Sequence, residues 1–582
     1  MKPVSGIFFA LITLIFAFFM ELNKQTLSGW ALLILAAIGF VYLYRHFGNN
    51  GWKKAGLWLA YLACFVLIVI ISWPPVKPVR AGDYKNPQYT SEIMTEYGPV
   101  QGIYNRDRSV EIFAGIPYAK PPVGPLRWRR PQDPDSWQDV RVCDTFAPMS
   151  MQVTDLPAYT SISRIVGYHD YKVSLDDNYR PPVSEDSLYL NIWKPAGEVS
   201  DLPVLVYIHG GSLQTGQTWY EDYSGEGFAK DGVITVNMGY RLGVFGFLAD
   251  ETMLEEEGTT GNYGLLDQIK ALEWVKDNIA AFGGDPENVT IAGESAGAVC
   301  VDALCTSPLA EGLFQRAILE SSTISSPMPP HSFRLFDEAI ASGNDLKQRY
   351  DAETIDDLRM IPAEQLVKEA ATQHHVTIDG TVLTDLPYNL RKQGMHNETA
   401  LLHGFNLEES GPFILFSHAN LKNYESKVRA YFGEYADDVL ALYDPATDEE
   451  ADRYWAEIYG AVFFNYSHDC LNRLMKETEP VYEYRFSKSN GRLSSWHSGE
   501  MIYAFGMIPD DSKLFDETDR HLSDVMHACW VNFTRTGDPN GEGLPVFETE
   551  IEQLMEFDTE IRIIDNPYRP LYDILDKMQG FE

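Results

Sequence analysis

The sequence predicts an α/β fold in which helices flank a largely parallel sheet. Short uninterrupted apolar runs recur along the chain, as expected for strands that are buried on both faces of a parallel sheet. These runs are residues 204–209, 233–238, 289–292, 317–319, 400–405 and 481–486. Segments with apolar residues at helical spacing lie between them, and residues 265–281 form the clearest amphipathic example. Alternation of strand and helix patterns is typical of the α/β class.

The sheet is predicted to begin with an antiparallel edge. Residues 98–118 contain two apolar stretches separated by a polar turn at residues 105–109. After residue 83 there is no low-complexity stretch, internal repeat or second linker. We therefore predict one large domain over residues 81–582.

The first 80 residues are predicted to be a membrane region. Three apolar runs without a charged residue occupy residues 4–20, 27–44 and 56–73. At 1.5 Å per residue, a run of this length spans about 26 Å as a helix, close to the thickness of a hydrocarbon core. The first run alone could be a signal peptide, although no small-residue cleavage site follows it. Three such runs in succession favour a multi-pass anchor, followed by a spacer with prolines at 74, 75 and 78.

Charge divides the chain in the same place. Residues 1–80 contain seven Lys or Arg and one acid, whereas the other 502 residues contain 39 basic and 82 acidic side chains. A body with a net charge of −43 repels phosphate backbones, so nucleic-acid binding is not expected. The six cysteines have no zinc-like or disulfide-like spacing and are interpreted as free thiols.

The pentapeptide Gly-Glu-Ser-Ala-Gly at residues 293–297 is the strongest catalytic signal. It follows a predicted strand and precedes a segment of small residues that is predicted to be a helix. A nucleophile on such a tight strand-to-helix turn requires minimal side chains two positions away on either side. We therefore predict Ser295 as a nucleophile, with the Ala296 N–H directed at a developing oxyanion.

Further oxyanion donors are predicted directly after the strand at residues 204–209. Gly210, Gly211 and Ser212 follow it, and glycines let the backbone approach a substrate carbonyl closely. A purely structural turn is the alternative interpretation of these residues.

Motifs over residues 98–582 resemble those of the type B carboxylesterases, a branch of the α/β-hydrolases. The matching stretches include SEDSLYLNIW (184–193), YIHGGS (207–212), YRLGVFGFL (240–248), the long run at 261–298, and WVNFTRTGDPN (530–540). The resemblance implies an α/β-hydrolase fold and a triad in the chain order serine, acid, histidine. It also implies internal ion pairs of Arg127 with Glu185 and of Arg241 with Asp267.

The acid and the base are located by the same resemblance. The stretch GFNLEES (404–410) matches the family's strand-end motif and places the carboxylate on Glu409, not on Glu408. The sequence WHSGE (496–500) resembles the family's His-x-x-Glu loop and makes His497 the base, whereas His403 matches by residue type alone. Glu409 would orient the imidazole and stabilise its charged form.

Two departures from the family pattern concern a disulfide and the oxyanion loop. Met151 and Ser187 stand where the family has its first disulfide, so this bridge is expected to be absent. The loop that normally contains three glycines ends here in Ser212, whose side chain is expected to crowd bulky acyl groups.

The predicted function is hydrolysis of small or medium carboxylic esters through an acyl-enzyme, by a membrane-anchored enzyme that needs no cofactor and no metal ion. The alternatives are a lipase acting on longer chains and a catalytically inactive adhesion protein of the same fold, which would have lost triad residues. The expected partners are a small ester and the lipid bilayer, and the sequence does not indicate an oligomeric state.

The orientation in the membrane follows from the loops. The loop between the second and third spans contains Arg45, Lys53 and Lys54 and no acid, which predicts a cytoplasmic position. The loop between the first two spans has no net charge. We therefore expect three crossings, with residues 80–582 outside the cytoplasm.

Overall fold

The computed structural model describes residues 3–48, 50–153, 179–369, 375–488, 495–547 and 550–581. Contacts divide the chain into two compact units, and each is described by itself below. The first contains Met1–Val79 with Val153–Pro182, and the second contains Arg80–Gln152 with Val183–Glu582.

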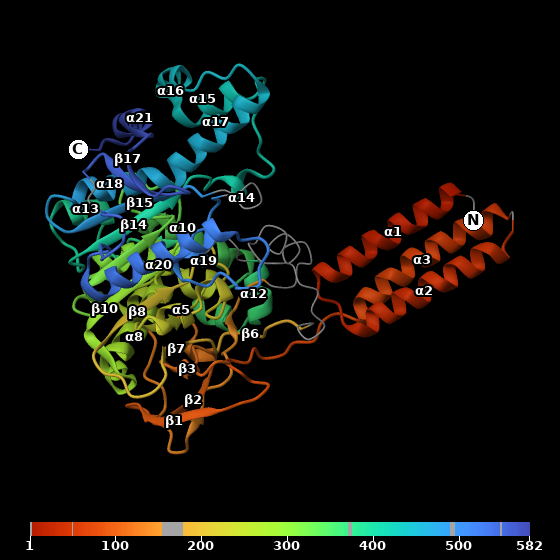
Figure 1. Cartoon of the computed structure of the whole chain (residues 1–582), viewed down its shortest axis with the longest axis horizontal. Coiled ribbons are helices and arrows are strands. Elements are labelled where there is room, and N and C mark those ends of the chain that lie inside the picture. The colour runs from red at the N-terminus through yellow and green to blue at the C-terminus, as the bar shows by residue number, and fades with distance from the viewer. Residues whose placement is uncertain are drawn as a thin grey trace. The chain divides into compact units, whose positions relative to one another are not determined.

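Three long apolar helices make up most of the first unit. They are α1 (Pro3–Leu22), α2 (Leu27–His46) and α3 (Gly51–Ile71), drawn in red in Figure 1. Each is long and apolar enough to cross a membrane by length and composition. Helix α3 begins five residues before the predicted third span, because its first turn includes Lys53 and Lys54. The Asn50 side chain caps this turn by accepting a hydrogen bond from the Lys53 amide.

Aromatic side chains hold these three helices together. The ring of Phe9 stacks on Phe40 at 4.7 Å, and Phe16 stacks on Phe65 at 3.7 Å. The hydroxyl groups of Thr13 and Tyr61 lie 2.9 Å apart and form a hydrogen bond between α1 and α3. Most other side chains of the helices are exposed and apolar, which is the reverse of a soluble helix bundle.

The second unit is built on one large mixed sheet with the order β1-β2-β3-β7-β9-β8-β10-β11-β14-β15-β16-β17. Figure 1 shows it from the orange β1–β3 end through β8 and β10 to β14 and β15. Its strands are β1 (Tyr89–Met94), β2 (Pro99–Tyr104), β3 (Val110–Pro117), β7 (Tyr189–Pro195), β8 (Leu202–Ile208), β9 (Ile234–Met238), β10 (Gly284–Glu294), β11 (Arg316–Glu320), β14 (Leu401–Asn406), β15 (Val481–Phe486), β16 (Gln553–Phe557) and β17 (Arg562–Asp565). The short strand β4 (Arg141–Val142) pairs with β2, and the pairs β5 (Met149–Ser150) with β6 (Val183–Ser184) and β12 (Phe333–Arg334) with β13 (Val376–Thr377) lie apart from it.

The strands from β9 to β16 are all parallel in this order, which confirms the predicted α/β class. Consecutive side chains of these strands are buried, so both faces of the sheet are covered, and this burial explains the uninterrupted apolar runs. The predicted antiparallel edge is also confirmed, since β2 pairs antiparallel with β3. The sequence patterns did not predict the strands β1, β4, β7, β16 and β17 of this sheet.

Helices lie between the strands of this sheet along the chain, and the last helix follows β17. They are α5 (Glu226–Lys230), α6 (Gly243–Phe247), α7 (Glu251–Glu257), α8 (Tyr263–Asn278), α9 (Ala296–Thr306), α10 (Phe336–Arg349), α11 (Ile355–Arg359), α12 (Ala363–Glu369), α13 (Pro387–Lys392), α14 (Gly411–Ile414), α15 (Tyr424–Phe432), α16 (Ala436–Leu442), α17 (Asp448–Gly460), α18 (Tyr466–Met475), α19 (Met501–Ala504), α20 (Glu517–Thr536) and α21 (Arg569–Gln579). The amphipathic segment predicted at residues 265–281 corresponds to α8, which continues as a short 3₁₀ turn over Ile279–Phe282.

Candidate active site

Ser295 lies on a sharp turn between the central strand β10 and helix α9. Its φ of 56° and ψ of −126° are rarely adopted by a residue with a side chain. Two backbone hydrogen bonds hold it there: the Ser295 amide donates to the Glu320 carbonyl at 2.8 Å, and the Val299 amide donates to the Ser295 carbonyl at 3.1 Å. Strain of this kind persists only where the surrounding structure enforces it, as it does at functional sites.

The two glycines of the pentapeptide make this turn possible. A Cβ at Gly293 would lie 2.5 Å from the carbonyl carbon of Gly297, and a Cβ at Gly297 would lie 2.0 Å from the Ile208 carbonyl oxygen. Both distances are far below van der Waals contact. The pattern Gly-x-Ser-x-Gly is therefore a steric requirement of the tight approach of α9 to β8 and β10.

Three side chains from distant parts of the chain meet at this turn. His497 Nε2 lies 2.8 Å from Ser295 Oγ, and His497 Nδ1 lies 2.6 Å from Glu409 Oε2. The rings of Phe413 and Phe464 pack against the imidazole at 5.1 and 4.9 Å. The structure thus brings together the three residues predicted from the sequence, with Glu409 almost completely buried at 1 % exposure.

Asn406, at the end of β14, connects the acid to the histidine loop. Its backbone amide donates to Glu409 Oε1 at 2.7 Å, and its side-chain amide donates to the Trp496 carbonyl at 2.8 Å. Asn406 therefore positions the carboxylate and the residue before His497 at the same time. The motif at residues 404–410 contains Asn406 but did not predict this role, because the contact to Trp496 joins segments 90 residues apart.

Glu408, the neighbour of Glu409, points elsewhere. Its side chain is exposed, whereas that of Glu409 is buried against the imidazole. Its backbone pairs with the histidine loop, since the Glu408 amide donates to the Ser495 carbonyl at 3.0 Å. The burial of Glu409 beside the imidazole and the exposure of Glu408 thus distinguish the two adjacent carboxylates of the motif.

Two further buried carboxylates surround the histidine. Glu294 Oε1 lies 3.4 Å from His497 Nε2 and accepts a 2.6 Å hydrogen bond from the Ser498 hydroxyl. Glu500 accepts hydrogen bonds from the Ser321 hydroxyl at 3.0 Å and from the Asn406 side-chain amide. Glu294 and Glu500 lie in the pentapeptide and in the His-x-x-Glu loop, but no sequence pattern predicted the contact between Ser498 and Glu294.

These charges determine the protonation of the site. Burial by itself lowers the pKa of His497, but the negative charges of Glu294 and Glu409 outweigh it and raise the pKa to about 9. Burial, reinforced by the charges of Glu294 and Glu409, raises the pKa of Glu500 to about 8. Burial likewise raises the pKa of Glu294, although His497 and the Ser498 hydroxyl oppose this rise. The cluster therefore favours a cationic imidazole beside Ser295.

The loop after β8 faces Ser295. An added Cβ at Gly210 would lie 2.6 Å from the Glu294 carbonyl oxygen, and one at Gly211 (φ 105°) would lie 2.2 Å from the Thr215 carbonyl oxygen. Ser212 has a φ of 55°, which suits the glycine that it replaces, and its side chain is exposed. The N–H groups of Gly211, Ser212 and Ala296 donate to no acceptor among the described residues.

Other expectations from the resemblance can be compared with the structure. Arg127 forms a two-pronged ion pair with Glu185, and Arg241 forms one with Asp267. The six cysteines are free. Ser187, where the family has a disulfide cysteine, accepts a hydrogen bond from the Ser150 hydroxyl. His403 lies within β14, stacked on His468 and fully buried, and takes no part in this cluster.

A parallel sheet with a serine on a strained strand-to-helix turn after its central strand defines the α/β-hydrolases. The model of the carboxylesterase family matches residues 89–574. The chain is 33 % identical over 474 residues to a fumonisin B1 esterase of Sphingopyxis macrogoltabida, covering 77 % of this chain and 82 % of that protein. It is 30 % identical over 514 residues to a para-nitrobenzyl esterase of Bacillus subtilis, covering 82 % and 96 %.

Solved structures agree with these sequence matches. A carboxylesterase of Geobacillus stearothermophilus has a TM-score of 0.70 and 30 % identity, covering 83 % of this chain and all of that one. The chain therefore belongs to the carboxylesterase family, and it is a carboxylic ester hydrolase.

Proposed function

We propose that this chain is a membrane-anchored serine esterase that hydrolyses small or medium carboxylic esters through a covalent acyl-enzyme. The observation that carries the proposal is the continuous contact from Ser295 Oγ through the His497 ring to Glu409. A serine hydroxyl becomes a useful nucleophile when a base accepts its proton and donors stabilise the oxyanion that forms.

Each step has an assigned residue. Ser295 Oγ attacks the ester carbonyl carbon while its proton passes to His497 Nε2. The Gly211, Ser212 and Ala296 amides donate to the oxyanion, and Gly210 keeps the loop close to Ser295. The imidazolium, stabilised by Glu409, then gives the proton to the leaving alkoxide. Water, deprotonated by the same imidazole, then attacks the acyl carbon. The bond to Ser295 Oγ breaks, the imidazolium returns the proton to Oγ, and the carboxylic acid is released.

The inactive adhesion alternative has no support, because the serine, the acid and the histidine are all present and in contact. The lipase alternative differs only in acyl length. Comparing kcat/KM on p-nitrophenyl esters of increasing chain length decides between the two classes of ester.

The three apolar helices support anchoring in a membrane. We propose that α1, α2 and α3 each cross the bilayer and that residues 1–80 form the anchor, leaving residues 81–582 as the catalytic domain. The positive loop after α2 supports a cytoplasmic position for that loop and hence an extracytoplasmic catalytic domain.

Replacement of the nucleophile tests the proposed chemistry. Ser295→Ala should lower kcat by about 10⁴–10⁶-fold, the range seen when a triad serine is removed, with an unchanged unfolding temperature. A fluorophosphonate probe should label the wild-type chain and not the variant. Labelling that persists in Ser295→Ala would contradict the assignment.

A further inference from the structure

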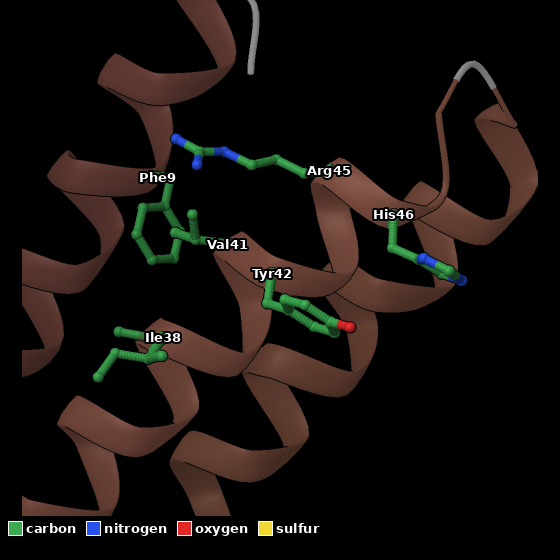
Figure 2. A pocket seen from close by; sticks show the side chains of 7 residues that line it. Phe9, Ile38, Val41, Tyr42, Arg45 and His46 are labelled. Carbon is green, nitrogen blue, oxygen red and sulfur yellow. The ribbon is translucent and has the colours of Figure 1, made fainter.

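The first unit contains an open apolar groove that the ester chemistry does not use. Its volume is about 720 Å³, and it lies between α1 and α2, far along the chain from Ser295. Figure 2 shows its wall, which is formed by Phe9 of α1 and by a set of residues of α2. The α2 residues are Ala37, Ile38, Val41, Tyr42, Arg45 and His46.

The lining follows the helical repeat. Positions 38, 41, 42 and 45 fall on one face of a helix, so the apolar stripe of α2 ends in a cation one turn after Val41. On the other side, Phe9 is held in place by stacking on Phe40 and by contact with the Tyr61 ring at 5.4 Å. The groove therefore has a rigid apolar wall and a charged end.

Arg45 lies at that end. Figure 2 shows its side chain extending from α2 toward α1, above Phe9 and Val41, whereas His46 lies beyond Tyr42. Arg45 is exposed, and no carboxylate among the described residues forms an ion pair with it. The only acid of the three helices is Glu21, which lies 12 residues beyond Phe9 along α1, at the other end of the bundle.

We propose that this groove binds one anionic phospholipid, with an acyl chain along Phe9, Ile38 and Val41 and the phosphate on the Arg45 guanidinium. Arg donates in a planar fork that matches phosphate oxygens, and basic sites between membrane helices select anionic headgroups. Lys53 and Lys54, at the start of α3, add positive charge at the same end without lining the groove.

Charge also argues against a second copy of the chain as the occupant. The helices of a second copy would bring the same cations and no acid to this end, so Arg45 would meet like charge. An anionic lipid supplies both the apolar chain and the missing counter-charge. This inference rests on the membrane insertion proposed above.

The test uses the full-length chain in phosphatidylcholine vesicles that contain either spin-labelled phosphatidylglycerol or spin-labelled phosphatidylcholine. The measured quantity is the relative association constant of the two labels, from the immobilised fraction of the spectrum. Arg45→Gln should lower the selectivity for phosphatidylglycerol by about fivefold, the contribution expected of one cation near an anionic headgroup. Ile38→Trp, which fills the groove and leaves all charges in place, should lower it as well.

Lys53→Gln is the matched control, because it removes the same unit charge at the same end of the helices. At about 0.5 M salt, long-range attraction is screened, so the effect of Lys53→Gln should disappear while that of Arg45→Gln remains. Equal effects of the two variants, or a selectivity that Ile38→Trp does not change, would overturn the lipid site. Extraction with alkaline carbonate separates the two proposals: a retained chain without selectivity contradicts this site alone, whereas a released chain contradicts the anchor and the site together.

Discussion

The Ser498 hydroxyl donates a 2.6 Å hydrogen bond to Oε1 of Glu294, the residue that precedes the proposed nucleophile. Ser498 adopts a φ of 70°, an unfavourable conformation for serine. The same carboxylate oxygen lies 3.4 Å from His497 Nε2. The hydrogen bond from Ser498 thus holds the Glu294 carboxylate close to the His497 imidazole. The negative charge of Glu294 should therefore affect the pH dependence of the reaction.

The proposed base must be neutral to accept a proton, so kcat/KM should fall as pH decreases below the His497 pKa of about 9. Replacing Glu294 by Gln removes a charge that raises this pKa. The acid limb should then move to lower pH by about 1 unit or more, as expected when an opposite charge within about 4–6 Å is removed. Measuring kcat/KM from about pH 5 to about pH 10 gives the shift of the acid limb, because this range covers the titration of His497 in the wild type and in the variant.

Ser498→Ala should move the acid limb in the same direction by a smaller amount. Without the hydroxyl donor, the pKa of Glu294 rises, less negative charge faces His497, and the pKa of His497 falls. Glu408→Gln removes an exposed carboxylate nearby and is the control that should leave the profile in place. An acid limb that moves to higher pH in either Glu294→Gln or Ser498→Ala would contradict this reading of the cluster.

The two adjacent glutamates should differ sharply in their effect on activity. Glu409→Gln leaves His497 without its orienting carboxylate and should lower kcat by roughly 10³–10⁴-fold. Glu408→Gln should stay within about tenfold of wild type, because its side chain is exposed. Steady-state kinetics on one p-nitrophenyl ester compares them, and the reverse order of effects would show that Glu408 is the acid.

Ser212→Gly should widen the range of accepted acyl groups. Glycine adopts the φ of 55° without strain. The change also removes the Ser212 side chain, which lies next to the residue's own amide, a proposed oxyanion donor. We expect kcat/KM to rise for branched and aromatic acyl esters and to change by less than about threefold for acetyl esters, since the amide donor is kept. Relief of the strained conformation should stabilise the fold by about 1 kcal/mol, measured by thermal unfolding. An unchanged ratio between bulky and small esters would remove Ser212 from the acyl pocket.

Protease accessibility tests the proposed orientation. Protease added to intact cells or spheroplasts should digest the catalytic domain. A tag inserted in the loop between the end of α2 and Lys53 should remain protected until lysis. Large domains translocate regardless of nearby charge, so Lys77 and Arg80 do not change this expectation. Protection of residues 81–582 until lysis would show the inverted orientation.

Features that depend on local sterics and periodicity could be predicted from the sequence. Gly293 and Gly297 reveal the turn at Ser295 because no larger residue fits there, and the buried strands β8, β14 and β15 were predicted to within a few residues because burial on both faces demands apolar runs. The family resemblance predicted Glu409 and His497, and the structure places His497 in contact with both Glu409 and Ser295. Each of these is a constraint on a few consecutive residues.

Contacts between segments far apart in the chain became visible only in the folded structure. Asn406 joins the acid to the histidine loop, and Ser498 meets Glu294 across 204 residues. Arg45 extends toward α1 over an open groove that has Phe9 in its wall (Figure 2). No sequence pattern predicted β16 between β15 and β17, since a strand of five residues, two of them polar, has a weak pattern of its own. Such contacts depend on how whole elements pack, and no rule of spacing along the chain specifies them.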